Sequence, residues 1–213
     1  MALLLADGRW PGGGHAHSGG LEAAVEDGSV HDEATLRAFL LGRLHTSGPT
    51  DAWFAGASCA IDPADPHAAS ALLALEDRYE ARMPSGAQRK AGRTLGRGLR
   101  RVARQVWEGG AQFDVEQYVV VLGAVARLAG LSPHAAARIA VHNLVAGAAT
   151  AAPKLYAIDM VDAMRAAVSL APVVDELIVR HVGLASPPAP RSAPLSEIRA
   201  ERHALWDVRL FAS

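Results

Sequence analysis

Two histidines and a serine near the start of the chain have the clearest potential for chemistry. His15, His17 and Ser18 lie in an eighteen-residue stretch, residues 5–22, that also holds six glycines and a proline. An imidazole is both a general base and a metal ligand, and a serine hydroxyl becomes a nucleophile when a base activates it. The stretch therefore raises three possibilities: a serine hydrolase, a metal site and a phosphate-binding loop.

Ser18 lacks the sequence context of a catalytic nucleophile. The nucleophile turn of α/β-hydrolases reads Gly-x-Ser-x-Gly and connects a buried strand to a helix. Here Ala16 occupies the first glycine position, and no strand pattern precedes it. The triple glycine at 12–14 likewise lacks the Gly-Lys-Ser/Thr ending and the preceding strand of a phosphate loop. We therefore interpret Ser18 as a helix cap or a loop residue that forms hydrogen bonds.

The two histidines of this stretch do not complete a metal site. Such a site needs three or four convergent ligands, and the other seven histidines are scattered without ligand spacing. Cys59 is the single cysteine, which excludes a Cys-based zinc site and an internal disulfide framework. We predict no catalytic residue, no metal and no cofactor, and we assign His15 and His17 to hydrogen bonds or partner contacts.

The elements that must position this loop are predicted to be helices. The chain has 213 residues, 50% of them hydrophobic and only 5% aromatic, and alanine is abundant. That composition favours closely packed helices over a β-sandwich, and the length suits one domain with a sizeable core. We predict an all-α fold: a single compact helical domain of about eight helices at residues 1–183. A Pro-rich linker and a C-terminal tail that binds a partner follow at 184–213.

Capping residues, prolines and apolar spacing locate these helices. Breaks are predicted at Ser47-Gly48-Pro49 and at Pro153, because proline removes a backbone donor and clashes with the preceding turn. Asp114 is predicted to cap a helix that ends at Gly130. The predicted helices cover residues 21–28, 32–45, 51–61, 65–79, 81–107, 114–130, 132–152, 159–170 and 173–182.

Residues 81–107 form a basic segment, with eight Arg or Lys and no carboxylate. A stripe of four arginines recurs at every fourth position and therefore lies on one face of a helix: Arg89, Arg93, Arg97 and Arg101. Three interpretations remain open for this stripe: ion pairs with the acidic remainder of the chain or a solvated face, a protein-partner surface, and an RNA-binding face. Glycines at 92 and 96 predict close packing against another backbone.

The C-terminal end is unusually apolar. Its last residues include Arg209, Leu210 and Phe211, behind a linker with four prolines at 184–194. Such a tail can dock on the core of its own domain, or it can become ordered on a partner. Composition leaves both interpretations open.

Charge and hydropathy limit the partners and the cellular location that we expect for this protein. The formal net charge is −1, so nothing global indicates nucleic acid or an acidic membrane surface. The apolar run at residues 2–5 is too short for a signal peptide, and no stretch has the length of a transmembrane helix. A single cysteine suits a reducing compartment. We expect a cytoplasmic protein that binds neither nucleic acid nor a membrane.

The spacing of the opening stretch also matches a known signature, which runs roughly Leu-Pro-x-Gly-Gly-Phe-x-x-Ser-x-Gly-Leu-Glu. This signature is that of the UreF family of urease accessory proteins, which the stretch resembles, with Trp10 and His15 in place of leucine and phenylalanine. The positions that match directly are Pro11, Gly13, Gly14, Ser18, Gly20, Leu21 and Glu22.

Weaker matches follow in the expected order. Residues 89–97 resemble the central helix of the family, and 142–146 resemble its later alanine-rich helix. His203 and the Arg-Leu-Phe of residues 209–211 resemble the family terminus. The chain departs from the pattern where Ala204 and Ala212 replace the usual Glu and Arg. It also departs near 151–156, where Pro-Lys-Leu replaces an Arg-Leu pair.

The resemblance implies an all-α, commonly dimeric protein that is not an enzyme. It implies a role in nickel insertion into urease, bridging the UreD/UreH scaffold and the GTPase UreG in a chaperone-like complex with apo-urease. The residues that we expect to contact these partners are Pro11, Gly13, Gly14, His15, His17, Ser18, Gly20, Glu22, Arg93, Arg97, His203, Arg209, Leu210 and Phe211. The alternatives are a hydrolase centred on Ser18 or on His15 and His17, and a basic RNA-binding helical module.

Overall fold

The computed structural model describes residues 1–7, 17–107, 113–191 and 193–211. Every regular element in these ranges is an α-helix, which confirms the all-α prediction. None of the helices in the described ranges has the length and apolar character needed to span a bilayer. The helices are α1 Ala2–Ala6, α2 Leu21–Glu26, α3 Glu33–Ala60, α4 Ala68–Glu80, α5 Gly86–Val106, α6 Tyr118–Leu128, α7 Pro133–Leu155, α8 Met160–Val168, α9 Ala171–His181 and α10 Pro194–Ala204.

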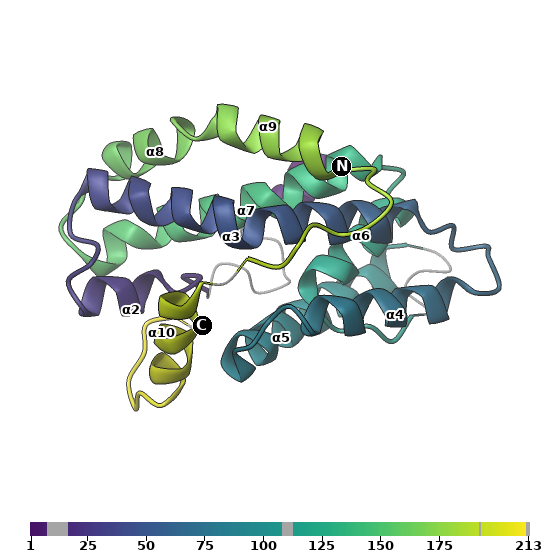
Figure 1. The fold of residues 1–213 in the computed structure, drawn as a ribbon, viewed down its shortest axis with the longest axis horizontal. Coiled ribbons are helices and arrows are strands. Elements are labelled where there is room, and N and C mark those ends of the chain that lie inside the picture. Colours follow the sequence, from purple (N-terminus) through teal and green to yellow (C-terminus); the bar gives the residue numbers. More distant parts are fainter. Residues whose placement is uncertain (8–16, 108–112, 192, 212–213) are drawn as a thin grey trace.

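The long helix α3 is the centre of the fold, and it packs against α6, α7, α8 and α9 (Figure 1). Helices α8 and α9 run along one side of α3, and α4 and α5 lie at the opposite side of the molecule. Helix α10 contacts α2 and α5. The segment between α9 and α10 crosses α3, where the Trp53 indole donates a hydrogen bond to the Leu184 carbonyl at 2.9 Å.

Helix α3 begins at a capping box. The Asp32 carboxylate accepts a hydrogen bond from the Thr35 amide at 2.8 Å, and the Thr35 hydroxyl accepts one from the Asp32 amide at 3.0 Å. These contacts satisfy backbone donors that the first turn of a helix leaves without partners. The predicted start of this helix is confirmed.

The predicted break at residues 47–49 is wrong, because α3 continues through Pro49. A proline inside a helix costs about 3 kcal/mol, since it removes one hydrogen bond and crowds the preceding turn. Here the residues that follow are buried on several sides, among them Trp53 and Phe54. The carbonyl of His45, which would accept from residue 49 in a regular helix, instead accepts from the Arg191 guanidinium at 2.9 Å. Packing and this replacement bond offset the cost.

Further boundaries differ from the prediction. Helix α4 begins at Ala68 rather than at a cap by Asp65, and α5 begins at Gly86 rather than at residue 81. Helix α7 continues through Pro153 to Leu155, where alanines at 148, 149, 151 and 152 are buried in the core. Helix α6 begins at Tyr118 rather than after Asp114. The Asp114 carboxylate lies 3.6 Å from Arg100 and 3.5 Å from Arg104. It therefore contributes to ion pairs with α5 and does not cap α6.

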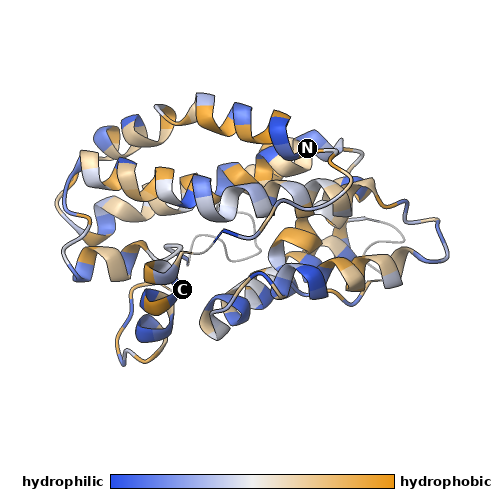
Figure 2. Ribbon diagram, in the orientation of Figure 1, coloured by the Kyte–Doolittle hydropathy of each residue, from blue (hydrophilic) through white to orange (hydrophobic). Residues whose placement is uncertain are grey.

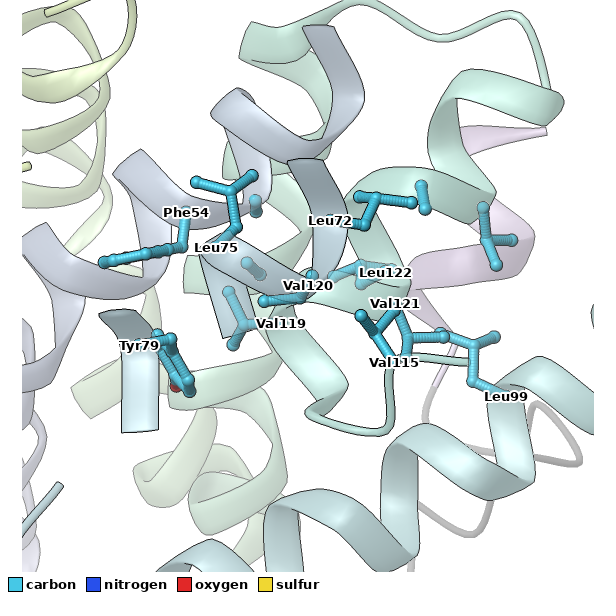
Figure 3. Close-up of a cluster of buried hydrophobic side chains, with 14 of the residues drawn as sticks. Phe54, Leu72, Leu75, Tyr79, Leu99, Val115, Val119, Val120, Val121 and Leu122 are labelled. Atoms are coloured by element: carbon cyan, nitrogen blue, oxygen red, sulfur yellow. The ribbon is translucent and has the colours of Figure 1, made fainter. Parts of the chain in front are cut away.

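The core has two main clusters of buried side chains. One joins the second half of α3 to α4 and α6, and Figure 3 shows Phe54, Tyr79, Val120 and Leu122 within it. The other joins the first half of α3 to α7 and α8, and it includes Phe211 from the end of the chain. Figure 2 shows that apolar residues recur along these helices.

Candidate partner-binding surface

The last residues of the glycine-rich stretch form an ordered turn into α2. Gly19 and Gly20 have φ values of +62° and +88°, in the left-handed region that favours glycine. The Ser18 hydroxyl is fully buried and accepts a hydrogen bond from the Glu22 amide at 3.3 Å. This confirms the interpretation of Ser18 as a loop residue that forms hydrogen bonds. A side chain at Gly19 would overlap the Arg43 guanidinium beneath the turn.

Glu22 joins this turn to the C-terminal end of the chain. Its carboxylate is buried and accepts hydrogen bonds from the Leu210 amide at 2.8 Å and the Phe211 amide at 3.0 Å. The His203 imidazole lies 2.9 Å from the same group. Burial opposes ionisation, but these hydrogen bonds outweigh it and lower the pKa of Glu22. We call this set of contacts the Glu22 clamp.

Two further contacts hold α10 on the body. Arg199 forms a two-pronged ion pair with Asp27, with distances of 2.7 and 3.0 Å. Glu201 accepts from the Ser85 hydroxyl at 2.6 Å and from the Ala87 amide at 2.9 Å, at the start of α5. Charge-assisted bonds of this kind are about twice as strong as neutral ones. The tail thus fastens α2 and α5 together.

The tail has a buried side and an exposed apolar side. Phe211 is 8% exposed, belongs to the core cluster around α7, and lies under the Lys154 ammonium. The end of the chain therefore docks on its own domain at this residue. In contrast, Leu205 and Val208 are each 84% exposed and Leu210 is 70% exposed. Leu195 and Ile198 on α10 are also exposed.

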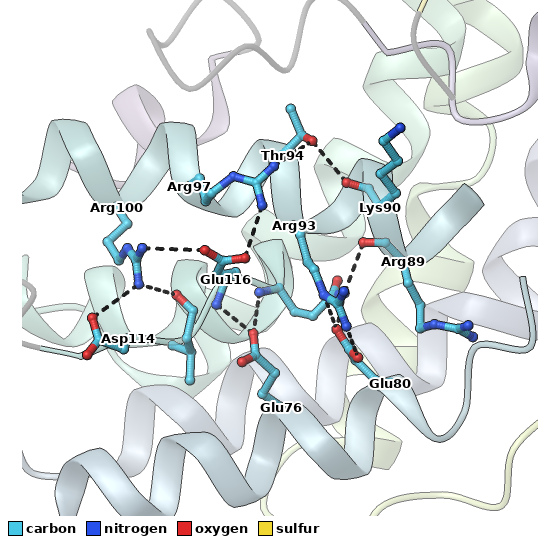
Figure 4. Close-up of polar contacts among 12 residues, drawn as sticks. Glu76, Glu80, Arg89, Lys90, Arg93, Thr94, Arg97, Arg100, Asp114 and Glu116 are labelled. Atoms are coloured by element: carbon cyan, nitrogen blue, oxygen red, sulfur yellow. Dashed lines mark hydrogen bonds and ion pairs between the residues drawn. The ribbon is translucent and has the colours of Figure 1, made fainter. Parts of the chain in front are cut away.

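Two arginines of the basic stripe on α5, Arg93 and Arg97, pair with the chain's own carboxylates (Figure 4). Arg93 pairs with Glu80, with an Nε–Oε1 distance of 2.7 Å, and this pair lowers the pKa of Glu80. Arg97 pairs with Glu116 at 3.0 Å. These contacts confirm the ion-pair interpretation for both arginines. A third carboxylate, Glu76, accepts from the backbone amides of Glu116 and Gln117 at 2.6 and 2.5 Å.

Gly96 shows why α5 carries a glycine on its inner face. A Cβ at this position would overlap the Glu116 carbonyl, so the helix and the 113–118 segment touch backbone to backbone. At Gly92 the Gln117 side chain fills the same space. The predicted close packing against another backbone is confirmed at Gly96 and is wrong at Gly92, where a side chain fills the space.

A buried polar group lies behind the turn at 17–20. The Tyr79 hydroxyl donates to the Asp51 carboxylate at 2.8 Å, and Arg43 donates to the Leu144 carbonyl at 2.8 Å. Burial raises the pKa of Asp51 to about 6, although Tyr79 and Arg43 oppose the shift. These groups line a cavity of about 540 Å³ that His17 also borders.

The structure therefore brings together only part of the predicted surface. The predicted residues that meet around the Glu22 clamp are Ser18, Gly20, Glu22, His203, Leu210 and Phe211. Arg209 is exposed beside them, whereas Arg93 and Arg97 lie on α5. Pro11, Gly13, Gly14 and His15 lie outside the described residues.

Several residues that fasten the tail were not predicted from the sequence. Asp27, Ser85, Arg199 and Glu201 have no motif, and their contacts span 114 to 172 residues. Within the described ranges, no group of three or more His, Cys, Asp or Glu could hold a metal ion. The buried Ser18 hydroxyl bonds to the Glu22 amide and does not have the exposure that a nucleophile requires.

Comparison with known proteins gives consistent matches. A family model described as UreF matches residues 30–171. A urease accessory protein UreF from Mycobacterium sp. (strain JLS) is 40% identical, over 99% of this chain and 97% of its own. One from Mycolicibacterium vanbaalenii is 39% identical over the same shares. One from Mycobacterium tuberculosis is 36% identical over 95% and 93%.

Proposed function

This chain belongs to the UreF family of urease accessory proteins, and from that premise we propose that it is required for urease maturation by nickel incorporation. In this proposal it bridges the UreD/UreH scaffold and the UreG GTPase, in a chaperone complex with apo-urease that depends on GTP hydrolysis. It acts in the cytoplasm as a homodimer within that complex, performs no catalysis, and has no cofactor of its own.

The observation that carries the proposal is the Glu22 clamp. Glu22 contacts both segments. Its backbone amide donates to the Ser18 hydroxyl in the turn that ends the glycine-rich stretch, and its carboxylate accepts from two backbone amides of the C-terminal tail. A partner bound to either segment therefore changes the surroundings of the other. A protein that binds two partners and couples the binding of one to the binding of the other needs such a connection between its two surfaces.

We assign the two segments to different partners. The tail at 184–213 presents exposed apolar side chains at Leu205, Val208 and Leu210 beyond a helix that is fastened to the body. Exposed apolar groups of this kind favour a protein contact, and we assign this surface to the UreD/UreH scaffold. The glycine-rich stretch lies at or beside the surface for UreG, with the helical domain at 1–183 as the rigid support.

The first prediction tests the tail surface directly. We expect the double variant Leu205→Asp with Val208→Asp to lose at least tenfold in co-purification with the UreD/UreH scaffold, because charges would replace the apolar contact. Both side chains are 84% exposed, so the fold should tolerate the change. Val179→Asp is the matched control, since Val179 is 78% exposed on α9, away from the tail. Equal capture of the double variant and the control would contradict the assignment.

The alternatives to this function have no support in the described geometry. A hydrolase centred on Ser18 would need an exposed nucleophile, and this hydroxyl is buried. An RNA-binding face on α5 would need cations free to meet phosphates, and two of the four stripe arginines, Arg93 and Arg97, pair instead with Glu80 and Glu116.

A further inference from the structure

A second, smaller pocket lies where the C-terminal segment meets the helical body. Its volume is about 210 Å³, and its walls come from α3, the end of α4, the start of α5 and residues 190–200. Three arginines line it: Arg43 and Arg82 from the body, and Arg191 from the segment. Its lining also includes four hydroxyl-bearing residues, Thr46, Ser47, Thr50 and Ser196.

The Arg82 guanidinium is only partly hydrogen-bonded within the described residues. Its side chain stacks on the Phe54 ring, 5.4 Å from the ring centre, and one guanidinium nitrogen donates to the Arg78 carbonyl at 2.6 Å. The Nε–H is buried and has no acceptor among the described residues. Residues 8–16 contain no Asp or Glu that could supply a carboxylate. A buried donor on a charged group is costly to leave unpaired.

The other two arginines come from different elements, Arg43 from α3 and Arg191 from the segment before α10. Arg43 donates to the Leu144 carbonyl and Arg191 donates to the His45 carbonyl, at 2.8 and 2.9 Å. Each guanidinium carries five N–H donors, so each retains further donors after this bond. Like charges that line one pocket repel one another, and a bound anion reduces this repulsion.

The carboxylates of the pocket do not balance these three charges. Only Asp51 and Glu197 line it among the described residues. Asp51 accepts from the Tyr79 hydroxyl at 2.8 Å, and Glu197 accepts from the Ala193 amide at 3.3 Å. Three guanidinium groups therefore face two carboxylates that already have donors of their own.

We propose that this pocket binds a tetrahedral oxyanion of the phosphate type. Arg43, Arg82 and Arg191 approach from different elements, which suits an anion with acceptors pointing in several directions better than a flat carboxylate. A volume of about 210 Å³ accommodates such an ion with a few waters of about 30 Å³ each. The bound ion joins the C-terminal segment to α3 and α4. This inference does not depend on the proposed function.

The test is titration calorimetry of the purified 213-residue chain with inorganic phosphate, at ionic strength held constant with sodium chloride. We expect saturable binding, and at least a tenfold loss of affinity in Arg82→Gln and in Arg191→Gln. Arg101→Gln is the matched control, because Arg101 is an exposed arginine outside the pocket and the change removes the same charge. The control should bind as the parent chain does.

Three outcomes would overturn the proposal: no saturable phosphate binding, equal binding of acetate, or unchanged affinity in both pocket variants. Equal acetate binding would identify a carboxylate ligand instead. Circular dichroism checks that each variant folds. Arg191 is exposed, so Arg191→Gln decides the question even if Arg82→Gln fails to fold.

Discussion

At the scale of single residues, Glu22 links α2 to the C-terminal tail through several hydrogen bonds. It ends the glycine-rich signature, lies in the first turn of α2, and accepts hydrogen bonds from the backbone amides of Leu210 and Phe211. A carboxylate in this place has two oxygens that accept several bonds at once, and the two amides need an acceptor because they lie beside the core. The last residue of the signature therefore also holds the C-terminal tail in place.

The variant Glu22→Gln tests this role. One carboxylate oxygen becomes an amide NH₂ that faces other donors, so we expect a loss of about 2 kcal/mol in the free energy of unfolding. We also expect faster proteolytic cleavage of residues 203–211. Glu26→Gln is the control, because Glu26 is an exposed residue of the same helix. A Glu22→Gln chain as stable and as protease-resistant as the control would refute the role.

Asp51 predicts a pH dependence of stability. Its pKa is about 6 in the folded chain, because of burial, and about 3.9 in an unfolded chain. The folded state therefore binds more protons between pH 4 and 6. Stability contributed by protonated Asp51 is present below pH 4 and is lost as the pH rises through 6, by up to about 3 kcal/mol.

Urea denaturation from pH 4 to 7 measures this contribution. The difference between the parent chain and Asp51→Asn should change with pH, because the asparagine has no proton to release. Asp77→Asn is the control, since Asp77 is an exposed residue on α4. Comparing each variant with the parent removes the opposite effect of Glu22, whose lowered pKa favours folding as the pH rises. Parallel curves for the parent and Asp51→Asn would disprove the assignment.

At the scale of elements, the contact between α5 and the 113–118 segment depends on one missing side chain. Gly96→Ala would push a methyl group into the Glu116 carbonyl. Overpacking of this kind costs about 1–3 kcal/mol. Gly42→Ala on α3 is the informative comparison, because nothing lies within 4 Å of its added Cβ. There the substitution should stabilise the helix by about 0.5–1 kcal/mol. Urea denaturation measures both effects. If the two variants shift the urea midpoint in the same direction relative to the parent chain, this account is contradicted.

The helices also show where local sequence stops being informative. Apolar spacing and capping predicted the start of α3 at Asp32 and of α7 at Ser132. Pro49 and Pro153 predicted breaks that do not occur, because the helix around each proline is buried by packing from distant elements. Local propensity cannot include that contribution, which comes from the assembled fold.

At the scale of the whole molecule, the fold class was predictable and the arrangement of the tail was not. Alanine content and helical periodicity are sufficient for an all-α domain. The signature and the terminal residues identified Glu22, His203 and Phe211 as candidates. These residues meet through contacts between positions that lie 181 to 189 residues apart in the sequence. A single sequence contains no signal for such distant contacts. The pairs of Arg199 with Asp27 and Glu201 with Ser85 were missed for the same reason.

The Glu22 clamp also has a consequence for biosynthesis. During translation, Glu22 is synthesised 181 residues before His203 and 189 residues before Phe211. A nascent or truncated chain leaves this carboxylate without its amide partners, and the entropy of closing so long a loop delays the contact further. The clamp therefore closes only on chains that have been synthesised through Phe211.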